Sequence, residues 1–131
     1  MRRLTMTLAT GSLFAGLALA PFAALAQEGD AAAGQRVFNQ CRACHTINEG
    51  GRNGVGPNLH GVVGRQAASV EGFRYSANMQ EWAPGKTWDE ANLRAYLTNP
   101  KDVLPRGSMA FPGLRNPQQL NDVIAYLKAQ S

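Results

Sequence analysis

The chain has 131 residues, a formal net charge of +4 and two cysteines. This length leaves room for one domain of ordinary size. No run of Lys and Arg interleaved with aromatic residues occurs, which argues against binding to nucleic acid. The mild positive charge would instead suit steering toward an acidic protein surface, if the basic residues cluster.

The first 26 residues have the pattern of a secretory signal peptide. Arg2 and Arg3 precede an apolar run over residues 4–25, which ends in the small-x-small cleavage pattern Ala24-Leu25-Ala26. We expect export to a bacterial periplasm and a mature domain at residues 27–131, with a net charge lowered from +4 to +2 by loss of the two arginines. Two alternatives stay open, namely a twin-arginine export route and an uncleaved membrane anchor.

Residues 30–39 are predicted to form the first helix. Asp30 is a suitable N-cap, and Val37 and Phe38 share an apolar side. Gly34 lies inside this helix, where glycine costs about 1 kcal/mol relative to alanine. We therefore expect another helix to approach closely at this glycine.

The segment Cys41-Arg42-Ala43-Cys44-His45 follows this helix and has the attachment pattern of c-type haem. The spacing lets Cys41 and Cys44 reach the two vinyl groups on one porphyrin edge. His45 then lies beneath the ring, where its imidazole can bind the iron as the proximal ligand. The sequence therefore predicts a covalently bound haem.

Three other interpretations of this motif have less support. A zinc site needs four ligands, and the chain offers only two cysteines, the adjacent His45 and the distant His60. A thioredoxin-like redox pair would need a βαβ pattern around it, and none is visible. A structural disulfide between Cys41 and Cys44 would close a very short loop and stabilise little.

Residues 46–86 are rich in glycine and show little periodicity, apart from a short helical turn expected at 76–81. A loop of this length is unusual in a compact domain. Its apolar residues need something to pack against, and a haem supplies it. These residues are Val55, Leu59, Val62, Val63, Phe73, Tyr75 and Trp82.

A second helix is predicted over residues 88–98. Thr87 and Glu90 have the spacing of a capping box, and Asn99-Pro100 is expected to stop the helix.

A third helix is predicted over residues 117–129, with Asn116 as N-cap, Pro117 in the first turn and Gln119 at the capping-box position. Its apolar residues recur at helical spacing and are expected to face the core. They are Leu120, Val123, Ile124 and Leu127.

Met109 is the expected sixth ligand of the iron. It lies in a loop over residues 105–113, whose prolines and glycines fix the course of the chain. The alternative is that Met109 fills the core. We expect Met79 to pack near the haem and His60 to be a solvated loop residue.

These features together resemble class I cytochrome c, the family of mitochondrial cytochrome c and its soluble bacterial relatives. The resemblance implies an all-α, loop-rich fold, in which three main helices pack around one covalently bound haem c with its iron. It covers essentially all of residues 27–131. The matching segments are Gly34 to His45, Gly56-Pro57-Asn58-Leu59-His60-Gly61 with Gly64-Arg65, Thr87-Trp88, Tyr96-Leu97, Asn99-Pro100-Lys101, Pro105 to Met109, and Asp122 to Leu127.

The resemblance implies roles for the residues near the iron. The carbonyl of Pro57 would accept a hydrogen bond from the second ring nitrogen of His45, which orients the imidazole and strengthens it as a ligand. The hydroxyl of Tyr96 would point at the sulfur of Met109.

The resemblance also implies roles at the edge of the haem and in the helix packing. Tyr75 and Trp88 would donate hydrogen bonds to a buried propionate, and Arg65 would balance its charge. Gly34 and Tyr126 would mark the crossing of the first and last helices. Ordinary core packing of the aromatic residues is compatible with these roles.

One segment departs from the mitochondrial pattern. The chain is slightly longer between Tyr75 and Trp88, near Trp82-Ala83-Pro84. Asn78 is therefore only a candidate for the asparagine that the family places near the methionine side.

Histidine and methionine together would leave the iron no open position, which predicts an electron carrier and not an enzyme. We expect a monomer without a small-molecule substrate, which shuttles electrons from a quinol:cytochrome c oxidoreductase-type complex to a terminal oxidase or a reaction-centre-type acceptor. Docking would use basic residues near the haem edge, which are Arg42, Lys101, Arg106 and Arg115. The alternatives are an electron-transfer subunit of a periplasmic dehydrogenase, a haem peroxidase and a gas sensor.

Overall fold

The computed structural model describes residues 11–18 and 29–131. The expected cleavage site after Ala26 and most of the expected signal peptide therefore lie outside the described residues. Within the described ranges, no helix is long and apolar enough to cross a membrane.

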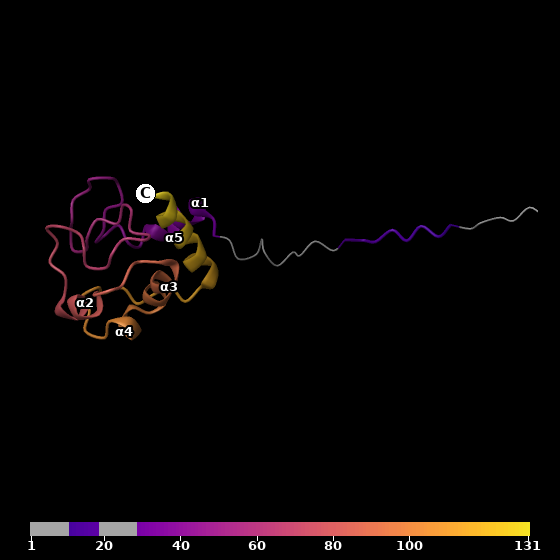
Figure 1. Cartoon of the computed structure of the whole chain (residues 1–131). Helices are drawn as coiled ribbons and strands as arrows, with labels where there is room; N and C mark the ends of the chain where they lie inside the picture. The colour runs from indigo at the N-terminus through magenta and orange to yellow at the C-terminus, as the bar shows by residue number, and fades with distance from the viewer. Residues whose placement is uncertain (1–10, 19–28) are drawn as a thin grey trace, which may run out of the picture.

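The described part of the chain contains helices and no strand, which confirms the prediction of an all-α fold (Figure 1). Three helices match the three main helices expected, and α2 matches the short helical turn. Helix α4 was not expected, because Asn99-Pro100 ends α3 as predicted but proline also suits the first turn of a new helix. The helices are α1 (Ala31–Phe38), α2 (Ala77–Trp82), α3 (Glu90–Thr98), α4 (Pro100–Val103) and α5 (Pro117–Ala129).

Side-chain caps begin the three longer helices. Asp30 accepts hydrogen bonds from the first turn of α1, and Asn116 does the same for α5, both as predicted. The predicted start of α3 is wrong by two residues. Asp89 caps α3 by accepting from the backbone N–H of Asn92 at 2.8 Å, whereas Thr87 forms an isolated antiparallel bridge with Gln66.

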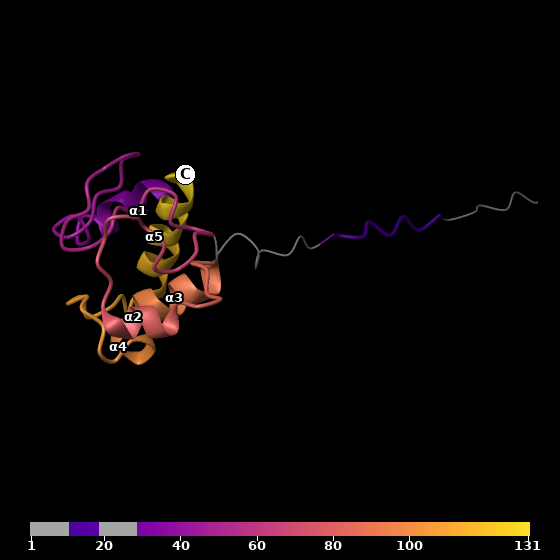
Figure 2. The ribbon, with the colours of Figure 1, turned by 60° about the vertical axis from the view of Figure 1, so that its left-hand side comes forward.

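Helix α1 crosses α5, and the backbones meet at a glycine. A Cβ atom on Gly34 would lie 1.9 Å from the carbonyl oxygen of Asp122 and 2.8 Å from Cβ of Tyr126. The rings of Phe38 and Tyr126 pack beside this crossing with centroids 5.3 Å apart. Figure 2 shows α1 and α5 together at one end of the domain. The expected crossing at Gly34 and Tyr126 is confirmed.

The core lies where α5 packs against α1 and α3. The four apolar residues predicted on α5 are all buried, so that helix stripe faces the core. Helix α2 lies near α4, at the end of the domain away from α1 (Figures 1 and 2).

Candidate haem site

The two cysteines and His45 form a turn directly after α1. The backbone N–H groups of Cys44 and His45 both donate to the carbonyl of Cys41, at 3.1 and 2.9 Å. Both cysteines are free and half-buried. Burial raises the pKa of the Cys41 thiol, and the positive charge of Arg42 opposes this shift. The turn therefore presents two uncombined thiols and an imidazole from one short segment.

The imidazole of His45 is fixed through one of its two nitrogens. Nδ1 lies 2.7 Å from the carbonyl oxygen of Pro57. A carbonyl only accepts hydrogen bonds, so Nδ1 carries the proton and Nε2 keeps a lone pair for a metal. Burial lowers the pKa of His45 against the raising effect of the Pro57 bond, and Arg65 lowers it further. The environment therefore favours a neutral, ligating imidazole.

Gly56 lets the loop approach this imidazole. A Cβ atom at this position would lie 2.2 Å from Cε1 of His45. The backbone N–H of Gly56 also donates to the carbonyl of Cys44 at 2.8 Å. The loop that carries Pro57 is thus tied to the cysteine turn itself.

Met109 lies beside an aromatic side chain of α3. The hydroxyl of Tyr96 lies 4.0 Å from Sδ of Met109 and donates to it. Burial raises the pKa of Tyr96 to about 12, so its hydroxyl stays protonated and remains a donor. The ring of Tyr96 packs on Trp88, which packs on Trp82, with centroid distances of 5.1 and 5.2 Å.

Arg65 carries the one buried side-chain polar atom that lacks a hydrogen-bond partner within the described residues, its Nε. Its Nη1 donates to the backbone carbonyls of Asn58 and His60, at 3.1 and 3.4 Å. Burial lowers the pKa of the guanidinium. An unpartnered buried donor on a cation calls for an anionic acceptor, and a haem propionate has the required chemistry.

Trp88 and Tyr75 are the other two residues expected at a propionate. Trp88 is buried, and its backbone N–H donates to the Arg65 carbonyl at 2.8 Å. Tyr75 accepts a hydrogen bond from the backbone N–H of Val70 at 3.0 Å, which leaves the proton of its hydroxyl free to be donated. The structure therefore places Arg65 and Trp88 together and leaves Tyr75 a free donor.

The structure also places the two residues that we did not expect to bind iron. Met79 is buried in α2, in agreement with packing. His60 is half-buried, with Nδ1 3.2 Å from the carbonyl of Ile47, so the expectation of a solvated histidine was wrong. The reason is the tight turn of the loop, which brings residue 60 back against residue 47.

Two asparagines hold loops together; the sequence assigned no role to Asn58 and named Asn78 only as a candidate near the methionine side. Asn58 joins three parts of its loop, since it donates to Thr46 Oγ1 and to the carbonyl of Asn48, at 2.8 and 2.9 Å. Asn78 accepts from the backbone N–H of Arg106 at 2.8 Å. Asparagine next to proline is a turn signal that could have indicated the first role, but nothing local indicates the second.

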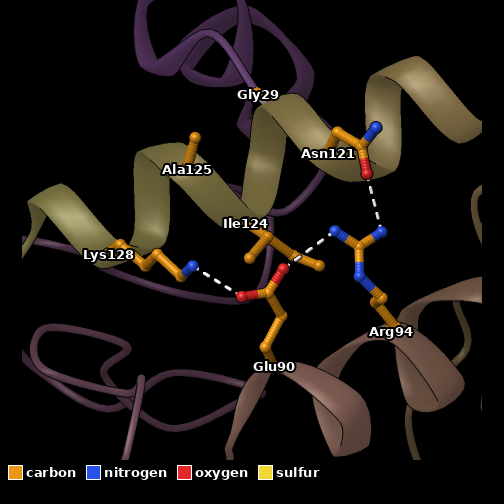
Figure 3. Close-up of a pocket in the computed structure, with 7 residues that line it drawn as sticks. All are labelled: Gly29, Glu90, Arg94, Asn121, Ile124, Ala125 and Lys128. Atoms are coloured by element: carbon orange, nitrogen blue, oxygen red, sulfur yellow. Dashed lines mark hydrogen bonds and ion pairs between the residues drawn. The ribbon is translucent and has the colours of Figure 1, made fainter. Parts of the chain in front are cut away.

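A shallow surface pocket between α3 and α5 lies outside this group of residues (Figure 3). Glu90 pairs there with Lys128 and Arg94, at 2.6 and 3.0 Å. Arg94 also donates to Asn121 at 2.6 Å. None of the expected site residues lines this pocket, and its paired charges act as a link between two helices.

The donor set fits haem c better than zinc. Across the described ranges, no group of three or more His, Cys, Asp or Glu side chains could hold a metal ion. Two free thiols, an imidazole with an available Nε2 and an unpartnered guanidinium nitrogen are instead what a covalently attached haem with a propionate needs.

Comparison with known proteins agrees with this chemistry. The family model described as cytochrome c matches residues 31–131. Cytochrome c2 of Rhodomicrobium vannielii is 47% identical over 115 residues, which cover 88% of this chain and 90% of that protein. Cytochrome c of Nigella damascena is 42% identical over 104 residues, which cover 79% and 92%.

A solved structure is also similar along nearly its whole length. Cytochrome cH from Methylobacterium extorquens superimposes with a TM-score of 0.71 at 43% sequence identity. The match covers 77% of this chain and 99% of that chain.

Proposed function

The chain belongs to the cytochrome c family, and on this basis we propose that it is a soluble periplasmic one-electron carrier whose haem iron is bound by His45 and Met109. The family brings one covalently bound haem c with its iron, and Cys41 and Cys44 fit its attachment motif. When bound, this group supplies one-electron redox chemistry. The chain is accordingly an electron carrier.

The hydrogen bond from His45 to Pro57 is the observation that carries this proposal. It fixes the tautomer, the ring orientation and the basicity of the imidazole at once. A histidine at the end of the attachment turn with Nε2 free is what a proximal haem ligand requires.

Met109 is supported as the second ligand by the donor that faces it. The Tyr96 hydroxyl directs its hydrogen bond at the sulfur and so favours one orientation of the thioether. Of the candidates we considered, Met79 is buried in α2 and His60 is turned toward Ile47. A thioether ligand raises the reduction potential, because a soft donor favours the reduced iron.

Arg65 and Trp88 would hold one propionate inside the domain, with Tyr75 as a further donor. The backbone bonds between residues 64–65 and Trp88 fix the relative positions of the two side chains. Placing a guanidinium beside a buried carboxylate offsets part of the cost of burying that charge.

Docking would occur through exposed basic residues near the cysteine turn (residues 41–45) and the loop over residues 105–113, which we call the methionine loop. Arg42, Lys101, Arg106 and Arg115 are all exposed. Arg106 is paired with Glu81 at 2.8 Å, so its charge is partly compensated. We propose a monomer that docks weakly on membrane redox complexes, a quinol:cytochrome c oxidoreductase-type donor and an oxidase or reaction-centre-type acceptor.

Three other functions would require either a permanent partner enzyme or an open coordination position on the iron. An electron-transfer subunit of a periplasmic dehydrogenase would be isolated together with that enzyme. A haem peroxidase or a gas sensor would need an open position on the iron. The hydrogen-bonded Met109 favours the carrier over both of these.

A redox titration of the purified holoprotein tests the proposal. We expect one reversible one-electron transition, and a lower potential in the Met109→Ala variant because the soft ligand is lost. A potential that does not change in this variant would contradict ligation by Met109.

A further inference from the structure

Helix α2 contacts the methionine loop through two side chains that both reach Arg106. Oδ1 of Asn78 accepts the backbone N–H of Arg106 at 2.8 Å. Oε2 of Glu81 pairs with Nη2 of the same arginine at 2.8 Å. Arg106 precedes Met109 by three residues, so both contacts act on the segment that presents the sulfur.

Asn78 and Glu81 lie on one face of α2, because residues three apart in a helix are neighbours. The helix is itself anchored. Ser76 caps its first turn by accepting from the backbone N–H of Met79 at 3.1 Å. Met79 is buried, and Trp82 packs on Trp88. The side chains that reach Arg106 thus start from a fixed support.

A second helix, α4, also contacts the methionine loop. Nζ of Lys101 in α4 donates to the carbonyl of Gly107 at 2.5 Å, and the N–H of Gly107 donates to the carbonyl of Leu104 at 3.0 Å. Contacts from α2 and α4 therefore fix the two consecutive residues 106 and 107.

We propose that Asn78 and Glu81 are positioning residues for Met109, so that α2 sets how readily the sulfur is displaced from the iron by an external ligand. This inference rests on the proposed ligation by Met109. Whatever frees the loop from α2 makes the state without bound sulfur more accessible, and an added ligand then competes more effectively.

The two contacts differ in expected strength. The side chain of Asn78 is half-buried, whereas Arg106 and Glu81 are 70% and 61% exposed in their ion pair. An exposed ion pair contributes little because water and salt screen it. We expect Asn78 to carry most of the effect.

The test measures imidazole binding to the oxidised holoprotein by absorbance. We expect Asn78→Ala to raise the affinity for imidazole about fivefold, the effect of one hydrogen bond. Asn78→Asp keeps the acceptor oxygen and should bind within about twofold of the parent protein by the same criterion. Glu81→Gln should change the affinity by less than about twofold, because the pair is exposed.

Asn92→Ala is the matched control. Asn92 loses a side-chain hydrogen bond to the carbonyl of Thr87, also between an asparagine and the backbone, but away from the methionine loop. The affinity for imidazole should not change. Alanine is a better helix former than asparagine, so neither substitution weakens its helix by propensity.

Amide hydrogen exchange of the folded holoprotein provides a second measurement independent of redox activity. The N–H of Arg106 should exchange faster in Asn78→Ala and at the parent rate in Asn78→Asp, because only the first loses the acceptor.

The outcomes separate this inference from the proposed function. If the parent protein shows the absorption of sulfur-bound ferric haem but Asn78→Ala binds imidazole as the parent does, the positioning role is wrong and Met109 ligation stands. If the parent lacks that absorption, both are overturned. Equal effects of Asn78→Ala and Asn92→Ala would also overturn the positioning role, because the effect would then be a general loss of stability.

Discussion

Gly56 lies so close to His45 that a Cβ atom on the glycine would be 2.2 Å from Cε1 of the imidazole. We expect Gly56→Ala to displace the ring or open the loop, and to lower the free energy of unfolding of the holoprotein by about 1–3 kcal/mol, as overpacking does. Denaturant unfolding, followed by haem absorbance, measures this.

Gly54→Ala is the control for this substitution. A Cβ atom on Gly54 would lie 3.2 Å from the carbonyl oxygen of Cys44, a contact that a shift of a few tenths of an ångström relieves. Its cost should therefore be clearly smaller. Equal losses of stability in the two variants would show that the contact with His45 is not what makes glycine necessary at position 56.

The sign of the stability change in Gly34→Ala distinguishes the effect of helix packing from that of helix propensity. Helix propensity alone predicts that Gly34→Ala stabilises the protein by about 1 kcal/mol. The structure predicts destabilisation, because the added Cβ would lie 1.9 Å from the carbonyl oxygen of Asp122 and force α1 away from α5. Thermal unfolding gives the sign. Gln35→Ala, on the exposed side of the same helix, should change stability little.

The close approach at Gly34 was predictable because its signal is local, a residue that weakens a helix and remains inside it. The caps Asp30 and Asn116 were predictable for the same reason, since each side chain accepts from a turn two or three residues away. The start of α3 was not, because Thr87 and Asp89 both suit a cap and only the pairing of Thr87 with Gln66 decides between them.

In the candidate site too, the features that depend on neighbouring residues were predictable and those that depend on distant residues were not. The cysteine turn is predicted by five consecutive residues. The structure places Nδ1 of His45 at hydrogen-bonding distance from the carbonyl oxygen of Pro57. The contact between Asn78 and Arg106 joins residues 28 apart in the sequence, and it depends on how α2 packs. No spacing rule connects two such residues, so only the folded arrangement shows the link.

Glu90 predicts a small pH dependence of stability. Its hydrogen bond with Lys128, then that with Arg94, lowers the pKa of the carboxyl below its ordinary value (Figure 3). A lowered pKa means that its stabilisation is complete above the unfolded-state pKa, about 4.3, and is lost as the pH falls through the folded-state pKa. Glu90→Gln should cost less than about 1 kcal/mol at pH 7, because the groups are half exposed.

This prediction is tested by the pH at which the parent and Glu90→Gln proteins become equally stable. Unfolding of the parent and Glu90→Gln proteins should differ at pH 7, and the difference should shrink below pH 4 or so. A difference that persists unchanged at pH 3 or so would show that charge is not the origin of the effect.

The exposed arginines that flank Met109 predict different effects of salt on electron transfer. Arg106 is paired with Glu81, whereas Arg115 forms no ion pair with any residue that the structure describes. The rate of reaction with an isolated quinol:cytochrome c oxidoreductase-type complex should fall with ionic strength. Arg115→Gln removes one positive charge and should reduce that dependence, whereas Glu81→Gln frees the charge of Arg106 and should increase it.

Stopped-flow measurements at several salt concentrations distinguish the two variants. The slope of rate against ionic strength should become shallower in Arg115→Gln and steeper in Glu81→Gln than in the parent protein. A reaction rate that does not change with ionic strength in any of the three proteins would show that basic residues do not steer docking.

Carbon monoxide binding to the reduced holoprotein at neutral pH tests most directly whether His45 and Met109 together saturate the iron. The parent protein should not take up the gas, whereas Met109→Ala should, because only the variant offers an open position on the iron. Ready uptake of carbon monoxide by the parent protein would show that His45 and Met109 do not saturate the iron.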